Sequence, residues 1–295
     1  MNIKRFFLVP VLVLLSASAY SQLNPMGSMY YQNQYLSNPA MAGLESGFEL
    51  NGGYKAQWTN VEGSPTIQTV TATYGSDNKK LGLGLSFYND KAGLIQRTSI
   101  KGSYAYHLPL NNENSFLDFG LSAGVTNEWI DFSLFKGNMG DQAFNNFNDR
   151  KLYFDGDFGL AFRNERITLQ AALPNLKRFF NRDLERNTID QSLYFASASY
   201  RFINTGGALA SVEPKLTYRG VKNYKGIFDL GVNTLFWGDN LMLNGIYHST
   251  NSVTIGAGTT FKKQLSILLM YTTNTGAVQN YNNGEFEVGL KYNFR

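Results

Sequence analysis

The last ten residues before the C-terminal arginine alternate strictly between two kinds of side chain. In Glu285–Phe294 every even position is a large apolar residue, and every odd position is polar or glycine. A period of two puts all the apolar side chains on one face of a β-strand. That face would be the core of a soluble sandwich, or the lipid-facing side of a transmembrane barrel with its polar side inside.

The same alternation recurs along the chain and predicts an all-β fold. Counting every such segment gives about fourteen strands, an even number, most of them near the 9–11 residues that a tilted membrane strand needs. The predicted strands are 46–58, 66–75, 80–89, 94–108, 116–130, 151–163, 167–174, 192–202, 208–219, 226–237, 240–248, 252–261, 264–273 and 285–295.

The lengths of the connections separate into two groups. Those after even-numbered strands are short turns, whereas those after odd-numbered strands include the long segments 131–150, 175–191 and 274–284. Outer-membrane barrels place short turns on the periplasmic side and long loops outside. A soluble sandwich has no reason to sort its connections in this way, so we predict an antiparallel transmembrane β-barrel over residues 46–295.

Composition agrees with a barrel and argues against most enzyme classes. Charged residues make up 16% of the chain and hydrophobic ones 43%, against about 25% charged in ordinary soluble domains. There is no cysteine and there are two histidines, which excludes thiolate sites and leaves little for a histidine-based metal or acid–base site. We therefore predict a non-enzymatic protein with no catalytic residue, no metal ligand and no cofactor.

The N-terminus has the three parts of a secretory signal peptide. Lys4 and Arg5 precede the apolar run Phe6–Leu15, and small residues follow up to Ser21, so we expect residues 1–21 to be removed on export. Removal lowers the formal net charge from +4 to +2, which argues against a nucleic-acid partner.

The predicted barrel interior carries charges of both signs, which favours a filled lumen over an ion-selective pore. The candidate plug is the segment 22–45, which is rich in aromatic residues and shows no strand alternation; a disordered periplasmic tail is the alternative. The inward-facing charged residues are predicted to be Glu49, Lys55, Arg97, Lys101, Asp118, Glu128, Asp155, Asp157, Arg201, Glu213, Lys215, Asp229, Glu285 and Lys291.

Aromatic residues stand out in two long loops and at the end of the last strand. Apolar clusters in loops 131–150 and 175–191 are candidate partner-binding surfaces, although these rings could also bury one another over the mouth of the barrel. The end of the last strand resembles the signal by which outer-membrane barrels are recognised for insertion. The residues concerned are Phe132, Phe135, Phe144, Phe147, Phe179 and Phe180 in the loops, and Tyr292 and Phe294 in the strand.

The two histidines and two pairs of glycines are the remaining candidates for a chemical site. His248 is expected near the outer end of a strand and His107 near the periplasmic rim, and neither has an orienting partner at an evident sequence spacing. We interpret both as interfacial residues. The pairs Gly82/Gly84 and Gly256/Gly258 lack the strand-to-helix context of a nucleotide fingerprint, and we interpret them as small inward residues that leave room for a plug.

The segment Gln32–Gly43 carries a recognisable pattern. Its form, Q-x-Y-x-x-N-P-A-x-A-G after a signal peptide, resembles the opening of the PorP/SprF family of outer-membrane proteins. Further similarities lie at Gln57-Trp58, Gly63-Ser64-Pro65-Thr66 and Gly82-Leu83-Gly84, and in Asn89-Asp90 followed by Gly93. The motif residues are Tyr35, Asn38, Pro39, Ala40, Gly43, Gln57, Trp58, Gly63 and Pro65.

This resemblance implies a component of the type IX secretion and gliding machinery of a Gram-negative outer membrane. It also implies a barrel related in architecture to long-chain fatty-acid transporters, embedded in membrane lipid. Expected partners are the C-terminal domain of a secreted adhesin, whose export or surface anchoring the protein would assist, and periplasmic ring or peptidoglycan-linked components. The alternative is an outer-membrane transporter or channel for a hydrophobic or small solute, and a surface hydrolase that uses His248 is a third hypothesis.

Overall fold

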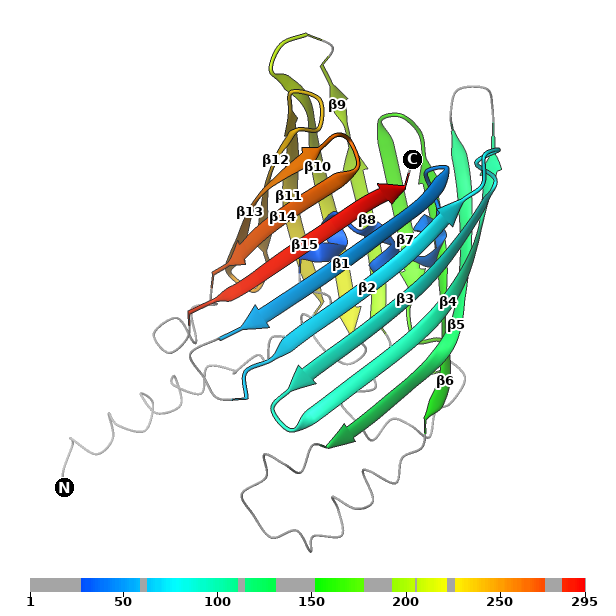
Figure 1. The fold of residues 1–295 in the computed structure, drawn as a ribbon, viewed down its shortest axis with the longest axis vertical. Helices are drawn as coiled ribbons and strands as arrows, with labels where there is room; N and C mark the ends of the chain where they lie inside the picture. Colours follow the sequence, from blue (N-terminus) through cyan, green and yellow to red (C-terminus); the bar gives the residue numbers. More distant parts are fainter. Residues whose placement is uncertain are drawn as a thin grey trace, which may run out of the picture.

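The computed structural model describes residues 28–58, 63–110, 115–130, 152–177, 193–204, 206–221, 226–273 and 283–294. In these residues the chain forms one closed antiparallel sheet, in which each strand pairs with the next and β1 pairs with β15. Figure 1 shows the tilted strands as a wall around short helical turns. The strands are β1 (Gly47–Gln57), β2 (Thr66–Gly75), β3 (Leu81–Ala92), β4 (Ile95–Pro109), β5 (Phe116–Ile130), β6 (Tyr153–Arg163), β7 (Ile167–Leu173), β8 (Leu193–Tyr200), β9 (Phe202–Ile203), β10 (Leu209–Val221), β11 (Ile227–Phe236), β12 (Leu241–His248), β13 (Ser252–Phe261), β14 (Leu265–Thr272) and β15 (Glu285–Phe294).

β8 and β9 form one interrupted strand, so the described part of the barrel has fourteen. Both strands pair with β10. The pairing of β8 ends at Lys215–Ser199 and that of β9 begins at Val212–Phe202, with Arg201 in the gap between the two strands. The interruption lies opposite Glu213 and Pro214, and a proline has no N–H group to donate to a neighbouring strand. The predicted strand count is therefore confirmed, and the ranges of β2, β5 and β13 agree with their predicted bounds.

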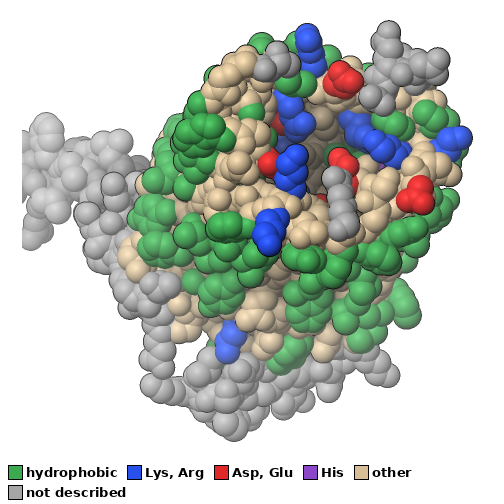
Figure 2. Space-filling view, turned by 45° about the horizontal axis from the view of Figure 1, so that its top comes forward, with side chains coloured by type: hydrophobic (Ala, Val, Ile, Leu, Met, Phe, Trp, Pro, Cys, Tyr) green, Lys and Arg blue, Asp and Glu red, His purple; other side chains and the backbone are tan. Residues whose placement is uncertain are grey.

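The alternation in sequence becomes an alternation of exposure. In β15, Phe286, Val288 and Leu290 are exposed, whereas Glu285 and Glu287, which alternate with them, are buried. The other strands expose their large apolar side chains on the same outer surface, as Figure 2 shows around the wall. An outer face of this kind is stable in lipid, and the fold is that of a transmembrane β-barrel. No helix among the described residues is long and apolar enough to span a membrane.

Most of the inward charges neutralise one another in pairs, as the mixed signs predict. The pairs join neighbouring or next-neighbouring strands, and most of their side chains are buried. They are Lys55–Glu285, Arg97–Glu128, Lys101–Asp157, Arg163–Asp118, Arg201–Glu213, Arg219–Asp229 and Lys291–Glu49.

Candidate functional site

The candidate site is the segment of residues 28–45, called here the lumenal segment, and the barrel wall around it. It forms three 3₁₀ turns, η2 (Met29–Tyr31), η3 (Gln34–Leu36) and η4 (Pro39–Met41), drawn in dark blue inside the barrel in Figure 1. Most of its side chains are buried. The backbone N–H of Ser28 donates to both carboxylate oxygens of Glu287, near the long-loop end of β15. Ala42 lies near the short-turn end, so the segment runs lengthwise through the lumen.

One end of the lumenal segment is held by a group of residues centred on Asp229. The carboxylate of Asp229 accepts a hydrogen bond from Tyr30 Oη. It also accepts from Nε and Nη2 of Arg219, at 2.7 and 3.0 Å. Its Oδ1 atom also lies 2.6 Å from Nδ1 of His248, whose Nε2 is 2.8 Å from Thr254 Oγ1. These five residues, the Asp229 cluster, satisfy a carboxylate fully enclosed in the lumen.

The other end is held by a second His–Asp–Arg group, the Asp118 cluster. Nδ1 of His107 lies 2.7 Å from Oδ1 of Asp118, and Arg163 Nε donates to Oδ2 at 2.9 Å. Nε2 of His107 lies 3.1 Å from the carbonyl oxygen of Ala42. Each histidine thus links the wall to one end of the lumenal segment, directly at Ala42 and through Thr254 to the hydroxyl of Ser28.

Both histidine interpretations from the sequence are wrong. His107 and His248 are buried in the lumen and each has an aspartate partner, although neither partner is evident from sequence spacing. The reason is strand register, since His107 lies opposite Asp118 on β5 and His248 opposite Asp229 on β11. Two inward residues equidistant from one hairpin turn are the signal that could have found both pairs.

The Asp229–His248–Thr254 arrangement resembles a hydrolytic triad only in its atom types. Thr254 is fully buried, and its hydroxyl lies within 3.1 Å of Ser28 Oγ and within 2.7 Å of Thr272 Oγ1. A nucleophile must reach a substrate carbonyl, and this hydroxyl is enclosed by the segment that it holds. No group of three His, Cys, Asp or Glu side chains placed to hold a metal occurs among the described residues.

The middle of the lumenal segment carries the motif residues. Tyr35 Oη is 2.7 Å from Ser103 Oγ, and Asn38 accepts from the N–H of Ala40 at the start of η4 and donates to the carbonyl of Leu160. Burial raises the pKa of Tyr35, and still more that of Tyr30, so both hydroxyls stay protonated and can donate.

Glycines in the wall make room for this segment. A Cβ at Gly84 would collide with the Tyr35 ring, and one at Gly82 with the Ala42 carbonyl. The expectation for Gly82 and Gly84 is thus met, but Gly256 and Gly258 face side chains and backbone of neighbouring strands instead of the lumenal segment. Gly43 has a φ of +64°, and a Cβ there would collide with the Tyr74 carbonyl.

The remaining motif residues lie elsewhere, at the long-loop end of β1. The N–H of Gln57 donates to the Pro65 carbonyl at 3.0 Å, and its side chain donates to Glu285. The N–H of Trp58 donates to Gly284, and the Gly63 carbonyl accepts from Gly93. The motif residues therefore lie in two places, one part in the lumenal segment and the other at the long-loop end of β1.

Sequence reasoning missed the apolar residues that face inward. Ile246, Phe195 and Ala172 form a buried cluster with Tyr30 and Tyr31 of the lumenal segment. Leu268 and Met270 form another with Met29. The inner face is thus not uniformly polar or glycine. The unbroken apolar run of β14, which cannot be lipid-facing on both sides, is the signal that could have indicated this.

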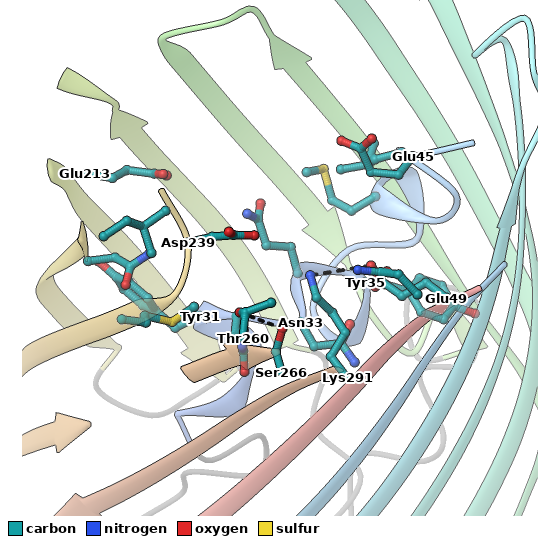
Figure 3. Close-up of a pocket in the computed structure, with 18 of the residues that line it drawn as sticks. Tyr31, Asn33, Tyr35, Glu45, Glu49, Glu213, Asp239, Thr260, Ser266 and Lys291 are labelled. Carbon is teal, nitrogen blue, oxygen red and sulfur yellow. Dashed lines mark hydrogen bonds and ion pairs between the residues drawn. The ribbon is translucent and has the colours of Figure 1, made fainter. Parts of the chain in front are cut away.

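A cavity of about 340 Å³ lies between the lumenal segment and the short-turn end of the barrel. Figure 2 shows Lys, Arg, Asp and Glu side chains around a hollow at this end, and Figure 3 shows the lining. The lumenal segment contributes Tyr31 and Tyr35, and the wall contributes Glu49, Glu213 and Lys291 among others.

The predicted loop residues Phe132, Phe135, Phe144, Phe147, Phe179 and Phe180, and the predicted signal peptide, lie outside the described residues. Tyr292 and Phe294 are on the outer face at the short-turn end, with ring centroids 4.6 Å apart. Their role as a barrel-assembly signal stays a prediction.

Residues 19–292 match the model of one protein family, described as "Type IX secretion system membrane protein PorP/SprF". The chain matches no curated protein sequence. Among solved structures, it is similar to the outer membrane protein Omp33 of Acinetobacter baumannii, with 11% identity and a TM-score of 0.49 over 85% of this chain and 100% of that one. A deletion mutant of the monoaromatic hydrocarbon channel TodX is similar with 10% identity and a TM-score of 0.49, over 88% of this chain and 94% of that one. A triple mutant of the Rhodopseudomonas blastica porin is similar with 12% identity and a TM-score of 0.36, over 84% of this chain and 98% of that one.

Proposed function

Because the chain belongs to the type IX secretion system membrane protein PorP/SprF family, we propose that it is a non-enzymatic barrel that assists the export or surface anchoring of a secreted adhesin. The adhesin's C-terminal domain is its cargo contact at the extracellular mouth. Periplasmic ring or peptidoglycan-linked components are its partners on the other side, and gliding motility is the process that such an adhesin serves. In this proposal residues 1–21 are the signal peptide and residues 22–45 close the lumen.

The observation that carries the proposal is the attachment of the lumenal segment to the wall. It is tied at one end through Asp229 and at the other through His107, and both of these residues are fully buried and hydrogen-bonded. Two buried clusters at opposite ends of one segment favour a lumen that stays closed. Freeing the segment would take the Tyr30 hydroxyl from Asp229 and the Ser28 N–H from Glu287, and would leave the buried Ala42 carbonyl without its donor. A closed barrel acts through its surfaces, and the extracellular surface is formed by the long loops.

The docking surface in this proposal is the aromatic set of loops 131–150 and 175–191. Aromatic side chains that are exposed in a free protein supply much of the energy of protein–protein contacts. Six phenylalanines lie in these two loops, and Lys177, Arg178, Arg182 and Arg186 beside them suit an acidic cargo surface.

The test is a gene deletion complemented by loop variants. The deletion strain should lose one or a few proteins from the cell surface, as measured by surface labelling and mass spectrometry. Replacing Phe132, Phe135, Phe144 and Phe147 by serine should reproduce that loss, while the barrel itself stays at wild-type abundance in the outer membrane. A matched replacement of four lipid-facing side chains by alanine, at Leu85, Leu121, Leu230 and Leu269, should leave the surface proteins in place. An unchanged set of surface proteins in the deletion strain would refute the proposal.

A transporter or channel is the second candidate, and the cavity at the short-turn end is the observation in its favour. Against a lateral opening in the wall, the pairing of β10 with β11 continues through Pro214, which lies opposite Val232. Conductance in planar bilayers separates the two candidates. Wild-type protein should give no stable open pore, and steady conductance by the wild type would favour the channel.

A further inference from the structure

Three buried polar atoms without hydrogen-bond partners and one buried lysine face the cavity between the lumenal segment and the short-turn end. They come from Tyr31 in η2, Lys215 in β10, Asn233 in β11 and Asn244 in β12. Buried polar groups in folded proteins are almost always paired, so several unpaired groups around one space call for an explanation. They gather on one side of the cavity because β10, β11 and β12 are neighbours and Asn233 pairs in register with Asn244.

Lys215 is the positive charge of this group. Its side chain is almost entirely buried, and Nζ lies 4.6 Å from the centroid of the Tyr31 ring. Among the described residues no carboxylate lies within ion-pair distance of this ammonium group, although the charge of Glu213 attracts it. The carboxylate two positions away, Glu213, accepts from Arg201 Nε and Nη2 at 3.0 and 2.8 Å, through one oxygen. The interior therefore holds an ammonium group with an aromatic contact and no hydrogen-bonded carboxylate, because the carboxylate that attracts it is engaged by Arg201.

The other three groups line the same cavity and offer hydrogen-bonding atoms. The hydroxyl of Tyr31 and the carboxamide oxygens of Asn233 and Asn244 are buried and make no hydrogen bond in the described structure. A tyrosine hydroxyl can donate to an anion, whereas a carboxamide oxygen accepts from an N–H group. Burial raises the pKa of Tyr31, so its hydroxyl keeps its proton.

We propose that this cavity binds a short peptide segment that carries a carboxylate. The carboxylate lies between Lys215 Nζ and Tyr31 Oη, and backbone N–H groups of the peptide donate to Asn233 and Asn244. A simple inorganic anion would satisfy the first two groups and leave the two acceptors unpaired. A ligand that has both a carboxylate and adjacent amide N–H groups satisfies all four, and the carboxylate can be a chain terminus or an acidic side chain.

The peptide reaches the cavity from the short-turn end, which faces the periplasm in outer-membrane barrels. Arg201, Lys263 and Lys291 line the cavity together with Glu45, Glu49 and Asp239, so the approach carries both signs of charge. The volume of about 340 Å³ is at the lower end of the range for ligand pockets, which suits a few residues of chain. This site is at the opposite end from the loops of the proposed function, and its test does not depend on them.

The experiment measures peptide binding to the purified full-length protein in detergent micelles by isothermal titration calorimetry. Three probes share a backbone: acetyl-Ala-Ala-Ala with a free C-terminal carboxylate, acetyl-Ala-Asp-Ala amide, and the neutral acetyl-Ala-Ala-Ala amide. At least one acidic probe should bind ten or more times as tightly as the neutral one. The free-carboxylate probe identifies a chain terminus, and the aspartate probe identifies an acidic side chain. Inorganic phosphate, the fourth probe, should bind at least tenfold more weakly than the better peptide.

Three variants assign the binding to the cavity. Lys215→Met should reduce the affinity for the acidic probe to that of the neutral one, and Tyr31→Phe should weaken it severalfold while keeping the aromatic ring. Lys80→Met, which removes an exposed lysine from the β2–β3 turn at the same end, should bind as the wild type does. Retained heat-dependent gel mobility shows that each variant forms the barrel. Equal affinity for all peptides, equal affinity for phosphate, or an undiminished affinity in Lys215→Met would overturn the proposal.

Discussion

His107 and Asp118 lie directly opposite each other in the β4–β5 ladder, and the second ring nitrogen of His107 is 3.1 Å from the carbonyl oxygen of Ala42. A single side chain therefore connects a wall carboxylate to the backbone of the lumenal segment. The other oxygen of Asp118 accepts from Arg163 Nε at 2.9 Å, so the same carboxylate also joins β6 to this contact.

Replacing this imidazole should loosen the short-turn end of the lumenal segment. In His107→Ala the buried Ala42 carbonyl loses its donor, which costs about 2 kcal/mol of unfolding free energy. The measurement is urea unfolding in detergent micelles followed by tryptophan fluorescence. Tyr106→Phe, on the lipid-facing side of the same strand, should leave the unfolding midpoint unchanged; an equal shift in both variants would contradict the assignment.

The Asp229 cluster should be more sensitive, because its arginine is more completely buried than that of the Asp118 cluster. Asp229→Asn removes the carboxylate that pairs with the buried Arg219 guanidinium and weakens the hydrogen bond from Tyr30. An uncompensated buried charge costs about 3 kcal/mol or more. Unfolding in urea gives the size of the effect, with the exposed turn variant Asp77→Asn as the control. A loss as small as that of the control would show that the cluster does not stabilise the barrel.

Glycine at position 43 should be required, whereas glycine at position 52 should not. Gly43→Ala places a Cβ against the Tyr74 carbonyl in a left-handed backbone conformation, and the expected loss is about 2 kcal/mol. A Cβ at position 52 would have no atom within 4 Å beyond its chain neighbours, so Gly52→Ala should be neutral or slightly stabilising. The two unfolding midpoints, measured side by side, decide the matter, and a tolerated Gly43→Ala would mean that the segment can shift away from the wall.

The buried tyrosine hydroxyls predict a loss of stability in alkali. Burial holds the pKa of Tyr30 well above its ordinary value of about 10, so above pH 10 the unfolded chain releases a proton that the folded barrel retains. Stability is therefore fully present below pH 10 and falls as the pH rises further. Tyr30→Phe, although less stable at neutral pH, should show a shallower fall between pH 10 and 11.5 in urea unfolding. Equal slopes for the two proteins would contradict the burial of this hydroxyl.

A lipid-facing charge provides an independent check of the outer surface. Leu290 is 48% exposed near the middle of β15, and Leu290→Lys should cost about 2–4 kcal/mol in a bilayer. Leu290→Val should cost far less, since it keeps the apolar surface. Folding into lipid vesicles at increasing urea measures both, and a tolerated lysine would place this face out of the membrane.

The wall could be predicted from the sequence because each of its strands carries its own evidence. In β15 the alternation of Phe286, Val288 and Leu290 with Glu285 and Glu287 is visible without any partner strand, and the exposures follow it. The lumen could not be predicted in the same detail. The pairing of His248 with Asp229 depends on the register of β11 and β12, and the contacts of Tyr30 depend on side chains about 200 positions away. Leu268 and Met270 were missed because an inward apolar residue makes sense only once its partner, Met29, is known.

The position of the lumenal segment immediately before β1 constrains the order of assembly. Ser28 is bound by Glu287 on β15, and β15 is the strand that pairs with β1 to complete the ring. The first described residues therefore find their partner only when the last strand arrives, while the barrel must not seal before the segment has entered. Closure of the wall and packing of the interior become one cooperative event, so the earliest-synthesised part of the barrel chain waits for the last to be made.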